Sequence, residues 1–188
     1  RKEGDRMIFL DRFSREVLSG ERVAEKLVAH MGERAFSWEL REHRSGLEEV
    51  RSYQDLWVEV DRRDFPDLIQ FLFTLDFPHF HVISGDDEGD GVRLIYHFSL
   101  FIACSRSARV GLSVSVLLPK GDLSMPSLQD RIPGAEYSER EMREMLGVEF
   151  AGMPNRGNIF LPEDWDDDVK PWRRDETAPG PDQVRELQ

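Results

Sequence analysis

The stretch RVGLSVSVLLP, residues 109–119, alternates apolar residues with glycine and serine. Because successive side chains of a β-strand point to opposite faces, this alternation predicts a strand with one buried face. The side chains expected on that buried face are Val110, Leu112, Val114 and Val116. Such a strand is stable only within a sheet, so the flanking sequence should supply its neighbours.

The sequence before residue 109 contains further strand patterns. VRLIYHFSLF (92–101) and FHVISGDD (80–87) are rich in β-branched and aromatic residues, and the segment 86–91 between them is typical of a turn. Three shorter strands are expected upstream, with HRSG (43–46) as a hairpin turn between the first two: residues 35–42, 47–53 and 56–61. Together these segments predict a mixed or antiparallel sheet.

Two segments, one before the first of these strands and one between residues 61 and 80, have the apolar spacing of amphipathic helices. In GERVAEKLVAHMG (20–32), the residues that fall roughly on one helical face are Val23, Leu27, Val28 and Met31. In DFPDLIQFLFTLDF (64–77), Asp64 is a candidate N-cap and Pro66 suits the first turn. Each helix therefore has an apolar face that can pack on the sheet.

A third helix is expected from Ser138 to Gly147, a residue type that commonly ends helices. Ser138 and Glu141 have the S-x-x-E spacing of a capping box. Charged residues four positions apart are expected to form exposed ion pairs, Arg140 with Glu144 and Glu139 with Arg143. The residues expected in the core are Met142, Met145 and Leu146.

The order of these elements predicts an α+β fold, a single domain in which two or three helices pack on a mixed or antiparallel sheet. After Phe150 the sequence contains several prolines and loses its periodicity. We therefore expect an N-terminal extension at residues 1–19, the α+β domain at 20–150 and a long extended C-terminal tail at 151–188.

The chain of 188 residues is strongly acidic, with 37 acidic and 25 basic residues and a formal net charge of −12. This charge argues against nucleic acid as a partner, because phosphate contacts need a basic patch. No apolar run approaches the ~20 residues that a membrane-spanning helix needs, and the first residues are too charged for a secretory signal. The single cysteine, Cys104, is expected to be buried and cannot form an internal disulfide or a four-cysteine metal site.

Two patterns are candidates for metal sites. Residues 86–91 resemble the first six positions of a calcium loop, but the twelfth position is His97, so a hairpin turn is favoured. His79 and His81 would share one face of a strand, but no third ligand follows at a familiar spacing. The acidic segment 163–168 is interpreted as a solvated loop. We expect no catalytic, cofactor-binding or metal-binding residue, and a small metal-dependent enzyme using both histidines is the distant alternative.

Residues 135–165, AEYSEREMREMLGVEFAGMPNRGNIFLPEDW, resemble the signature of the C subunit of NADH-quinone oxidoreductase, respiratory complex I. The matching positions are Glu139-Arg140-Glu141, Leu146-Gly147-Val148, Phe150, Gly152 and Pro154. Residues 170–175 resemble the closing segment of that family, and the resemblance covers roughly residues 20–175. Met153 stands where the family has histidine, and Gly157 and Asn158 stand where it has arginines, with Arg156 one step earlier.

With these departures, the chain looks more like the corresponding subunit of group 4 membrane-bound [NiFe] hydrogenases and related sulfur-reducing complexes. We favour that branch, with the C subunit of NADH-quinone oxidoreductase proper as the alternative. Either resemblance implies a non-catalytic structural subunit in the hydrophilic arm of a membrane-bound redox complex, which couples electron transfer to ion translocation. A free adaptor or assembly factor is a third alternative.

The resemblance also implies partners and a location. The partners would be a large catalytic-like subunit and an iron–sulfur small subunit, which would carry the iron–sulfur clusters and any nickel–iron centre, with a membrane arm attached to the complex. The chain itself would be peripheral, on the cytoplasmic side of the cell membrane. We expect the tail after Phe150 to wrap along the large subunit, so that cutting the chain there leaves the domain folded but abolishes assembly. The residues expected at this interface are Glu139, Arg140, Glu141, Met153, Pro154, Arg156, Trp165, Trp172, Arg173 and Arg174.

Overall fold

The structure is a computed structural model that describes residues 13–34, 36–46, 51–104, 109–181 and 183–184. The chain divides into two compact units, the first within residues 1–81 and 96–116 and the second within residues 82–95 and 117–188. The predicted boundaries of the extension, the domain and the tail stay predictions.

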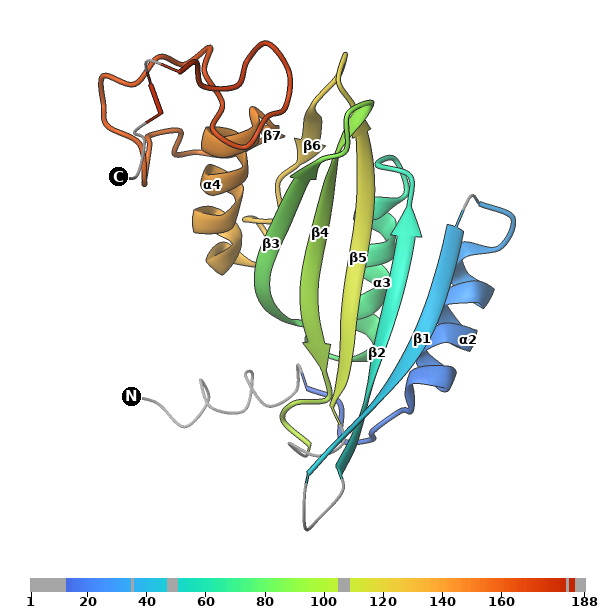
Figure 1. Ribbon diagram of the computed structural model, residues 1–188. Coiled ribbons are helices and arrows are strands. Elements are labelled where there is room, and N and C mark those ends of the chain that lie inside the picture. Colours follow the sequence, from blue (N-terminus) through green and yellow to red (C-terminus); the bar gives the residue numbers. More distant parts are fainter. Residues whose placement is uncertain (1–12, 35, 47–50, 105–108, 182, 185–188) are drawn as a thin grey trace, which may run out of the picture. The chain divides into compact units, whose positions relative to one another are not determined.

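A five-stranded sheet runs through the described chain (Figure 1). Its strands are β1 (Phe36–Ser45), β2 (Arg51–Val60), β3 (His79–Asp87), β4 (Gly91–Leu100) and β5 (Val110–Pro119). Their order is β1-β2-β5-β4-β3, and β2 pairs antiparallel with β1 but parallel with β5. The sheet is therefore mixed, and its combination with helices confirms the predicted α+β class.

Strand β5 occupies the middle of the sheet, between β2 and β4. The alternating apolar residues Val110, Leu112, Val114 and Val116 are buried, as predicted. Ser113 and Ser115 on the opposite face are also nearly buried, at 8% exposure each. The prediction of a single buried face was therefore wrong, because serines on a central strand are small enough for larger neighbouring side chains to cover them.

The predicted hairpin turn at residues 43–46 was also wrong. β1 continues through His43, which pairs with Tyr53, to Ser45, which pairs with Arg51. The described parts of the two expected strands at 47–53 and 56–61 form one strand, β2, and residues 47–50 lie outside the described residues. Because β1 lies at an edge of the sheet, its polar residues can face water without ending the strand.

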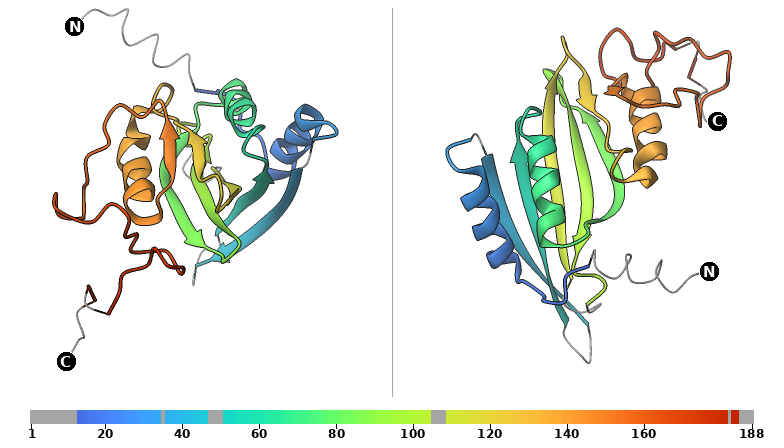
Figure 2. Two further views of the ribbon diagram at one scale, coloured as in Figure 1. Left: turned by 90° about the horizontal axis from the view of Figure 1, so that it is seen from above. Right: turned by 180° about the vertical axis from the view of Figure 1, so that it is seen from behind.

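In the first unit, α2 (Gly20–Met31) and α3 (Phe65–Leu75) lie against the same face of the sheet (Figure 2). Pro66 occupies the first turn of α3 as predicted, but the Asp64 side chain makes no capping hydrogen bond. Val28 is 42% exposed, so it lies outside the buried face of α2. The buried residues of the two helices are Gly20, Val23, Ala24, Leu27, Met31, Phe65, Leu68, Ile69 and Leu72.

Cys104 is only half-buried, so the expectation of a core cysteine was wrong. Its thiol donates a hydrogen bond to the Ser14 carbonyl, with an S···O distance of 2.7 Å. Asp76 is buried. Its carboxylate accepts hydrogen bonds from the backbone N–H groups of Ser14, at 2.8 Å, and Phe101, at 2.5 Å. These contacts connect residue 14 to residues far along the chain within the first unit.

In the second unit, α4 (Glu136–Leu146) follows a 3₁₀ turn (Pro133–Ala135) and begins two residues before the predicted start. Its N-cap is Ala135, which lacks a capping side chain, so the predicted capping box was wrong. The helix ends at Gly147 as predicted, with the glycine in the left-handed region at φ 77°. The predicted core residues Met142, Met145 and Leu146 are buried.

We expect Gly147→Ala to lower the free energy of unfolding by about 1 kcal/mol, because a β-carbon disfavours the left-handed backbone. Space is not the cause, since the nearest atoms to an added β-carbon are Lys170 side-chain carbons at 3.5 Å. Gly121→Ala is the control, because nothing lies within 4 Å there and its φ is not positive. Urea unfolding of both variants measures the difference, and equal effects would contradict the prediction.

Residues 120–134, between β5 and α4, contain a short strand that the sequence did not predict. β6 (Ser124–Pro126) pairs in parallel with β7 (Glu149–Ala151), which directly follows α4. Three-residue strands carry too little periodicity to be recognised from sequence. Their pairing brings the segment before α4 and the segment after it together.

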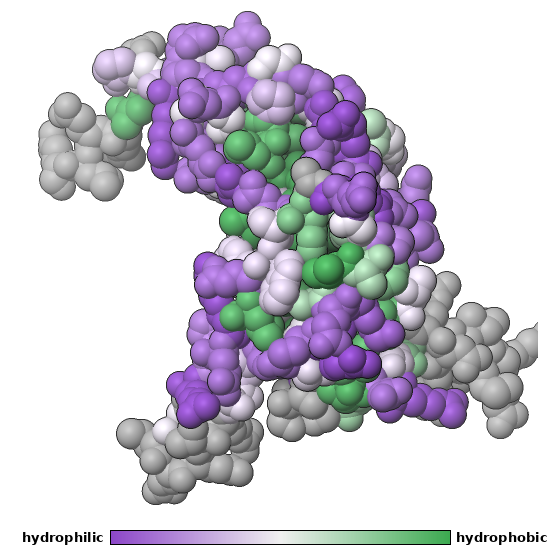
Figure 3. Space-filling model, turned by 90° about the vertical axis from the view of Figure 1, so that its right-hand side faces the viewer, coloured by the Kyte–Doolittle hydropathy of each residue, from purple (hydrophilic) through white to green (hydrophobic). Residues whose placement is uncertain are grey.

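No helix in the described part of the chain is long and apolar enough to span a membrane. On the face shown in Figure 3, apolar residues reach the surface in small patches with hydrophilic residues between them. This surface agrees with the high content of charged residues.

Candidate partner interface

Glu139 of the Glu-Arg-Glu motif has no exposed surface. One carboxylate oxygen accepts from the backbone N–H of Leu128 at 2.6 Å, and the other accepts from Ser127 Oγ at 2.7 Å and Gln129 Nε2 at 2.8 Å. Burial raises the pKa of Glu139, and these hydrogen bonds limit the rise. Glu139 therefore joins α4 to the loop before it, rather than offering a free carboxylate to a partner.

Glu144 is also almost fully buried, at 2% exposure. Its carboxylate accepts from three consecutive backbone N–H groups, Ile159 at 3.0 Å, Phe160 at 2.9 Å and Leu161 at a shorter distance. An irregular segment has no neighbouring strand to accept hydrogen bonds from its backbone N–H groups. A carboxylate that binds successive N–H groups takes the place of that acceptor. Glu144 therefore fixes residues 159–161 against α4.

Arg140 and Arg143 bind the same segment through its carbonyl groups. Arg140 Nε donates to Gly157 O at 3.0 Å, and Arg143 Nη1 donates to Arg156 O at 3.1 Å. The expected ion pairs of Arg140 with Glu144 and of Glu139 with Arg143 are not among the contacts of these described residues. Both carboxylates bind backbone N–H groups elsewhere. Arg140 instead pairs with Glu136, four residues before it, at 3.4 Å.

Three aromatic side chains of α4 and the tail are exposed on the second unit. Tyr137 is 66% exposed, with its ring against the Arg140 guanidinium. Phe160 is 61% exposed, although its backbone N–H binds Glu144. Trp172 is 42% exposed, and its backbone N–H donates to Met145 O at 3.0 Å. We refer to Tyr137, Phe160 and Trp172, with Glu141, as the α4 surface.

Glu141 lies half-buried on α4, one turn after Tyr137. Burial raises its pKa, and the charge of Glu144 raises it further. No described residue supplies a positive charge to its carboxylate. It is the member of the Glu-Arg-Glu motif that the described chain leaves available.

A cluster of four charged residues holds the tail to the β3–β4 hairpin in the second unit. We call Asp87, Lys120, Arg173 and Asp175 the tail clasp. Asp87 has no exposed surface and lies 3.2 Å from both Lys120 Nζ and Arg173 Nε. Asp175 pairs with Lys120 at 2.6 Å and closely with Arg173. The Arg173 side chain is only 8% exposed, so this predicted interface residue is used inside its own unit.

The tail clasp makes stability depend on pH. Burial opposes the charged form of Asp175, but hydrogen bonds from Lys120, Thr177 and Arg173 outweigh burial and hold its pKa well below the ordinary value of 3.8. Burial and hydrogen bonds act in the same way on Asp87, with the backbone N–H groups of Arg174 and Gly89 as leading donors. A depressed carboxyl pKa contributes stability that is present above the unfolded pKa and lost as the pH falls through the folded pKa.

We therefore expect the stability difference between wild type and Asp175→Asn to be largest at pH 7 and to shrink below about pH 4. Urea unfolding at pH 7, 4 and 3 measures this difference, and Asp166→Asn on the exposed loop is the control. A difference that stays constant from pH 7 to pH 3 would contradict the assignment of the clasp to ionised carboxylates.

The other predicted interface residues divide into exposed and internal ones. Met153 is 6% exposed and belongs to the core. Pro154 is exposed, and Arg156 pairs with Glu149 at 3.0 Å on the surface. Arg174 is exposed and pairs with Asp86 at 2.9 Å. Trp165 is half-buried, and its indole N–H donates to the Val169 carbonyl at 2.9 Å.

The histidines considered as metal ligands lie on β3. The His79 and His81 rings are 5.0 Å apart, and His81 Nε2 lies 2.8 Å from Ser99 Oγ. In the turn considered as a calcium loop, Asp87 belongs to the tail clasp and Glu88 pairs with Arg93 at 2.5 Å. Within the described ranges, no three histidine, cysteine, aspartate or glutamate residues are placed to hold one metal ion.

Sequence reasoning missed Glu144 and the clasp carboxylates. Glu144 binds residues 15 to 17 positions later, and Arg173 reaches Asp87 across 86 positions. No local spacing rule reports such contacts. The available signal was the matched position of Leu146-Gly147-Val148, two residues after Glu144, which marked the end of α4 but not which groups the carboxylate binds.

Comparison with known proteins supports the resemblance of residues 135–165. Membrane-bound hydrogenase subunit beta of Pyrococcus furiosus is 33% identical over 123 residues, which are 64% of this chain and 69% of that protein. Hydrogenase-4 component G of Escherichia coli is 29% identical over 130 residues, but the chain spans only 23% of that longer protein. A chain of the archaeal membrane-bound sulfane sulfur reductase shares the fold, with a TM-score of 0.62 at 21% identity over 82% of this chain and 84% of that one.

The family match covers most of the chain. Residues 58–182 match the family described as the 30 Kd subunit of respiratory-chain NADH dehydrogenase. This range contains β3 to β5, α4, the Glu-Arg-Glu motif and the tail clasp. The chain therefore belongs to the family of the 30 Kd subunit of respiratory-chain NADH dehydrogenase, which confirms the resemblance identified from its sequence.

Proposed function

We propose that the chain is a non-catalytic structural subunit of a membrane-bound redox complex of the hydrogenase type. The observation that carries the proposal is the α4 surface. Arg140 contacts the Tyr137 ring, and α4 binds the backbone of Phe160 and of Trp172, while all three aromatic side chains are exposed. Aromatic residues in this setting have the composition of interaction hot spots. The family membership, together with relatives named as hydrogenase subunits, supports a complex as the destination of this surface.

The partner of the α4 surface in this proposal is the large catalytic-like subunit. The iron–sulfur clusters, and a nickel–iron centre if the complex is a hydrogenase, belong to partner subunits in this proposal. The complex attaches to a membrane arm, and the chain is peripheral on the cytoplasmic side. The C subunit of NADH-quinone oxidoreductase is the second candidate, and the name of the family supports it.

The tail has a different role in this proposal from the extended wrap that the sequence indicates. Glu144 and the tail clasp hold residues 159–161 and 173–175 within the second unit. The tail thereby presents Phe160 and Trp172 beside α4, and the partner contacts this assembled surface. Pro154, Arg156, Trp165 and Arg174 extend the proposed interface around it.

The test is co-purification of the tagged chain with its complex. A triple variant, Tyr137→Ser with Phe160→Ser and Trp172→Ser, is expected to weaken the association at least ~30-fold, the loss that a single hot-spot aromatic of about 2 kcal/mol would cause. The matched control changes exposed apolar residues of the first unit, Val17→Ser with Val28→Ser and Trp38→Ser. Circular dichroism checks that both proteins are folded, and retention of the partner by the triple variant would reject the surface.

A further inference from the structure

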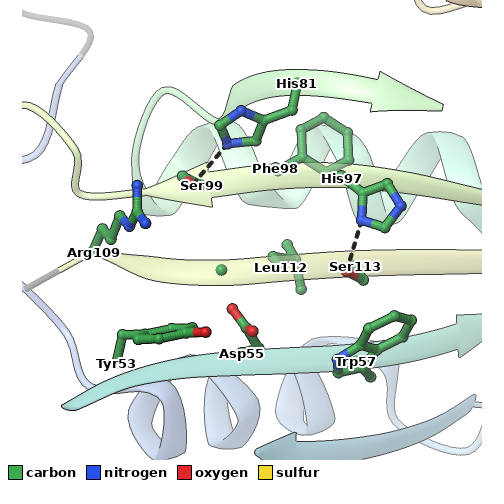
Figure 4. A pocket seen from close by; sticks show the side chains of 11 residues that line it. Tyr53, Asp55, Trp57, His81, His97, Phe98, Ser99, Arg109, Leu112 and Ser113 are labelled. Carbon is green, nitrogen blue, oxygen red and sulfur yellow. Dashed lines mark hydrogen bonds between the residues drawn. The ribbon is translucent and has the colours of Figure 1, made fainter. Parts of the chain in front are cut away.

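A pocket of about 280 Å³ lies on the sheet face of the first unit that α2 and α3 leave uncovered (Figure 4). Four strands contribute to it, because residues of one parity on each strand point to this face. β2 supplies Tyr53, Asp55 and Trp57, and β3 supplies His81. The pocket residues of β4 and β5 include His97, Ser99 and Ser113, and Arg109 directly precedes β5.

Both imidazoles of the pocket bind serine hydroxyls. His81 Nε2 lies 2.8 Å from Ser99 Oγ, and His97 Nδ1 lies 3.1 Å from Ser113 Oγ. Burial lowers the pKa of both histidines below 6.5, and the charges of His79, Arg109 and His97 lower that of His81 further. Asp55 acts in the opposite direction on His97. Both rings are therefore mainly neutral at pH 7.

Arg109 is exposed at the pocket and forms no ion pair with any described residue. The carboxylate that shares the pocket, Asp55, lies 3.2 Å from His43 Nε2 instead. Asp55 also fills the space above Gly111, where an added β-carbon would meet its carboxylate oxygen at 1.9 Å. In Figure 4, Arg109 and His81 lie near Ser99, while Asp55 projects from β2. The Arg109 guanidinium can therefore form an ion pair with an anionic group of another molecule.

We propose that this pocket receives the carboxylate of an aspartate or glutamate side chain from a partner polypeptide. The planar guanidinium of Arg109 pairs with the carboxylate, and the His81 imidazole and the Ser99 hydroxyl donate to it. Guanidinium groups bind carboxylates in this bidentate manner. The volume suits one side chain rather than a larger cofactor, and Trp57 and Tyr53 beside it add the residue types that dominate protein interfaces.

This site is separate from the α4 surface and does not depend on the kind of complex. A carboxylate beside a neutral imidazole favours its protonated form, so binding takes up a proton. The groups that face His81 are His79, His97 and Arg109, and all three oppose its protonation in the free chain. Affinity for the carboxylate is therefore expected to rise as the pH falls from 7.5 to 5.5.

The test is an NMR titration of the isotope-labelled full chain with N-acetyl-glutamate α-amide, whose only charge is a side-chain carboxylate. Saturable shifts are expected for backbone amides of residues 97–99 and 109–113, with tighter binding at pH 5.5 than at 7.5. Arg109→Gln is expected to weaken binding about tenfold. Arg22→Gln, which changes an exposed arginine of α2, should leave binding unchanged.

Two outcomes would overturn the proposal. One is an equal response to N-acetyl-glutamine α-amide, or no saturable shift with either probe. The other is tighter binding of inorganic phosphate, which would make the pocket a general anion site. Co-purification of the Arg109→Gln variant with the complex separates the two proposals, because the α4 surface is intact in that variant.

Discussion

Glu139→Ala is expected to lower the free energy of unfolding by about 3 kcal/mol. The side chain has no exposed surface, and the substitution leaves the Leu128 N–H, the Ser127 hydroxyl and the Gln129 amide without their acceptor. Each buried group that loses its partner costs more than the net value of the bond that was lost. The cavity left by the missing carboxyl adds to this cost.

Urea unfolding at pH 7 measures the effect, with Glu25→Ala on the exposed face of α2 as the control. Glu25 is 61% exposed, and its replacement by alanine within a helix should change stability by under about 0.5 kcal/mol. Glu139→Gln keeps one oxygen for the Leu128 N–H and should fall between the two. If Glu139→Ala were as stable as the control, the motif would have no structural role and its carboxylate would be free for a partner.

Arg173→Met is expected to lower the free energy of unfolding by about 3 kcal/mol, because it removes one partner of a buried ion pair. Asp87 has no exposed surface, and Arg173 also donates to the Leu146 carbonyl at 3.2 Å. The substitution leaves a buried carboxylate with Lys120 as its remaining cationic partner. The same change should loosen Trp172, which precedes Arg173 in the tail.

Arg174→Met is the matched control, since the neighbouring side chain is 67% exposed and its pair with Asp86 is on the surface. It should cost less than about 0.5 kcal/mol. A double-mutant cycle with Asp87→Asn isolates the clasp, with an expected coupling of about 1–3 kcal/mol. Additive effects of Arg173→Met and Asp87→Asn would show that the two side chains do not act together.

The clasp also changes the outcome expected from truncation. The sequence suggested that cutting after Phe150 would leave the domain folded. Cutting there removes the backbone N–H partners of Glu144 and the Arg173 partner of Asp87, and both carboxylates are buried within the same unit. Loss of assembly in a truncated chain would therefore not distinguish unfolding from loss of an interface, whereas the surface variant does.

Local sequence patterns predicted most helices and strands correctly, but they did not predict which residues contact one another across the fold. The alternation of β5 and the apolar periodicity of α2, α3 and α4 follow from the geometry of single elements, so one segment is enough to recognise them. The length of β2 and the pairing of β6 with β7 depend on neighbours in the sheet, which sequence spacing does not report.

The Glu-Arg-Glu motif illustrates the same limit for the candidate site. Helix spacing correctly placed Arg140 and Glu144 one turn apart, but the energetic value of a surface ion pair is small. Backbone N–H groups of irregular segments also need acceptors. Where burial removes water, the carboxylates of Glu139 and Glu144 bind these N–H groups instead of a neighbouring arginine. Helix spacing alone therefore predicted a solvated polar face on this helix. In the structure, Glu139 and Glu144 of that face are buried and bind neighbouring segments.

The most direct test of the central claim is purification of the tagged chain from gently solubilised membranes, followed by mass spectrometry and metal analysis. The account predicts a large subunit, an iron–sulfur subunit and membrane proteins in fixed ratio, with nickel, and loss of all of them in the triple variant of the α4 surface. Recovery of the wild-type chain alone, without any such partner, would contradict it.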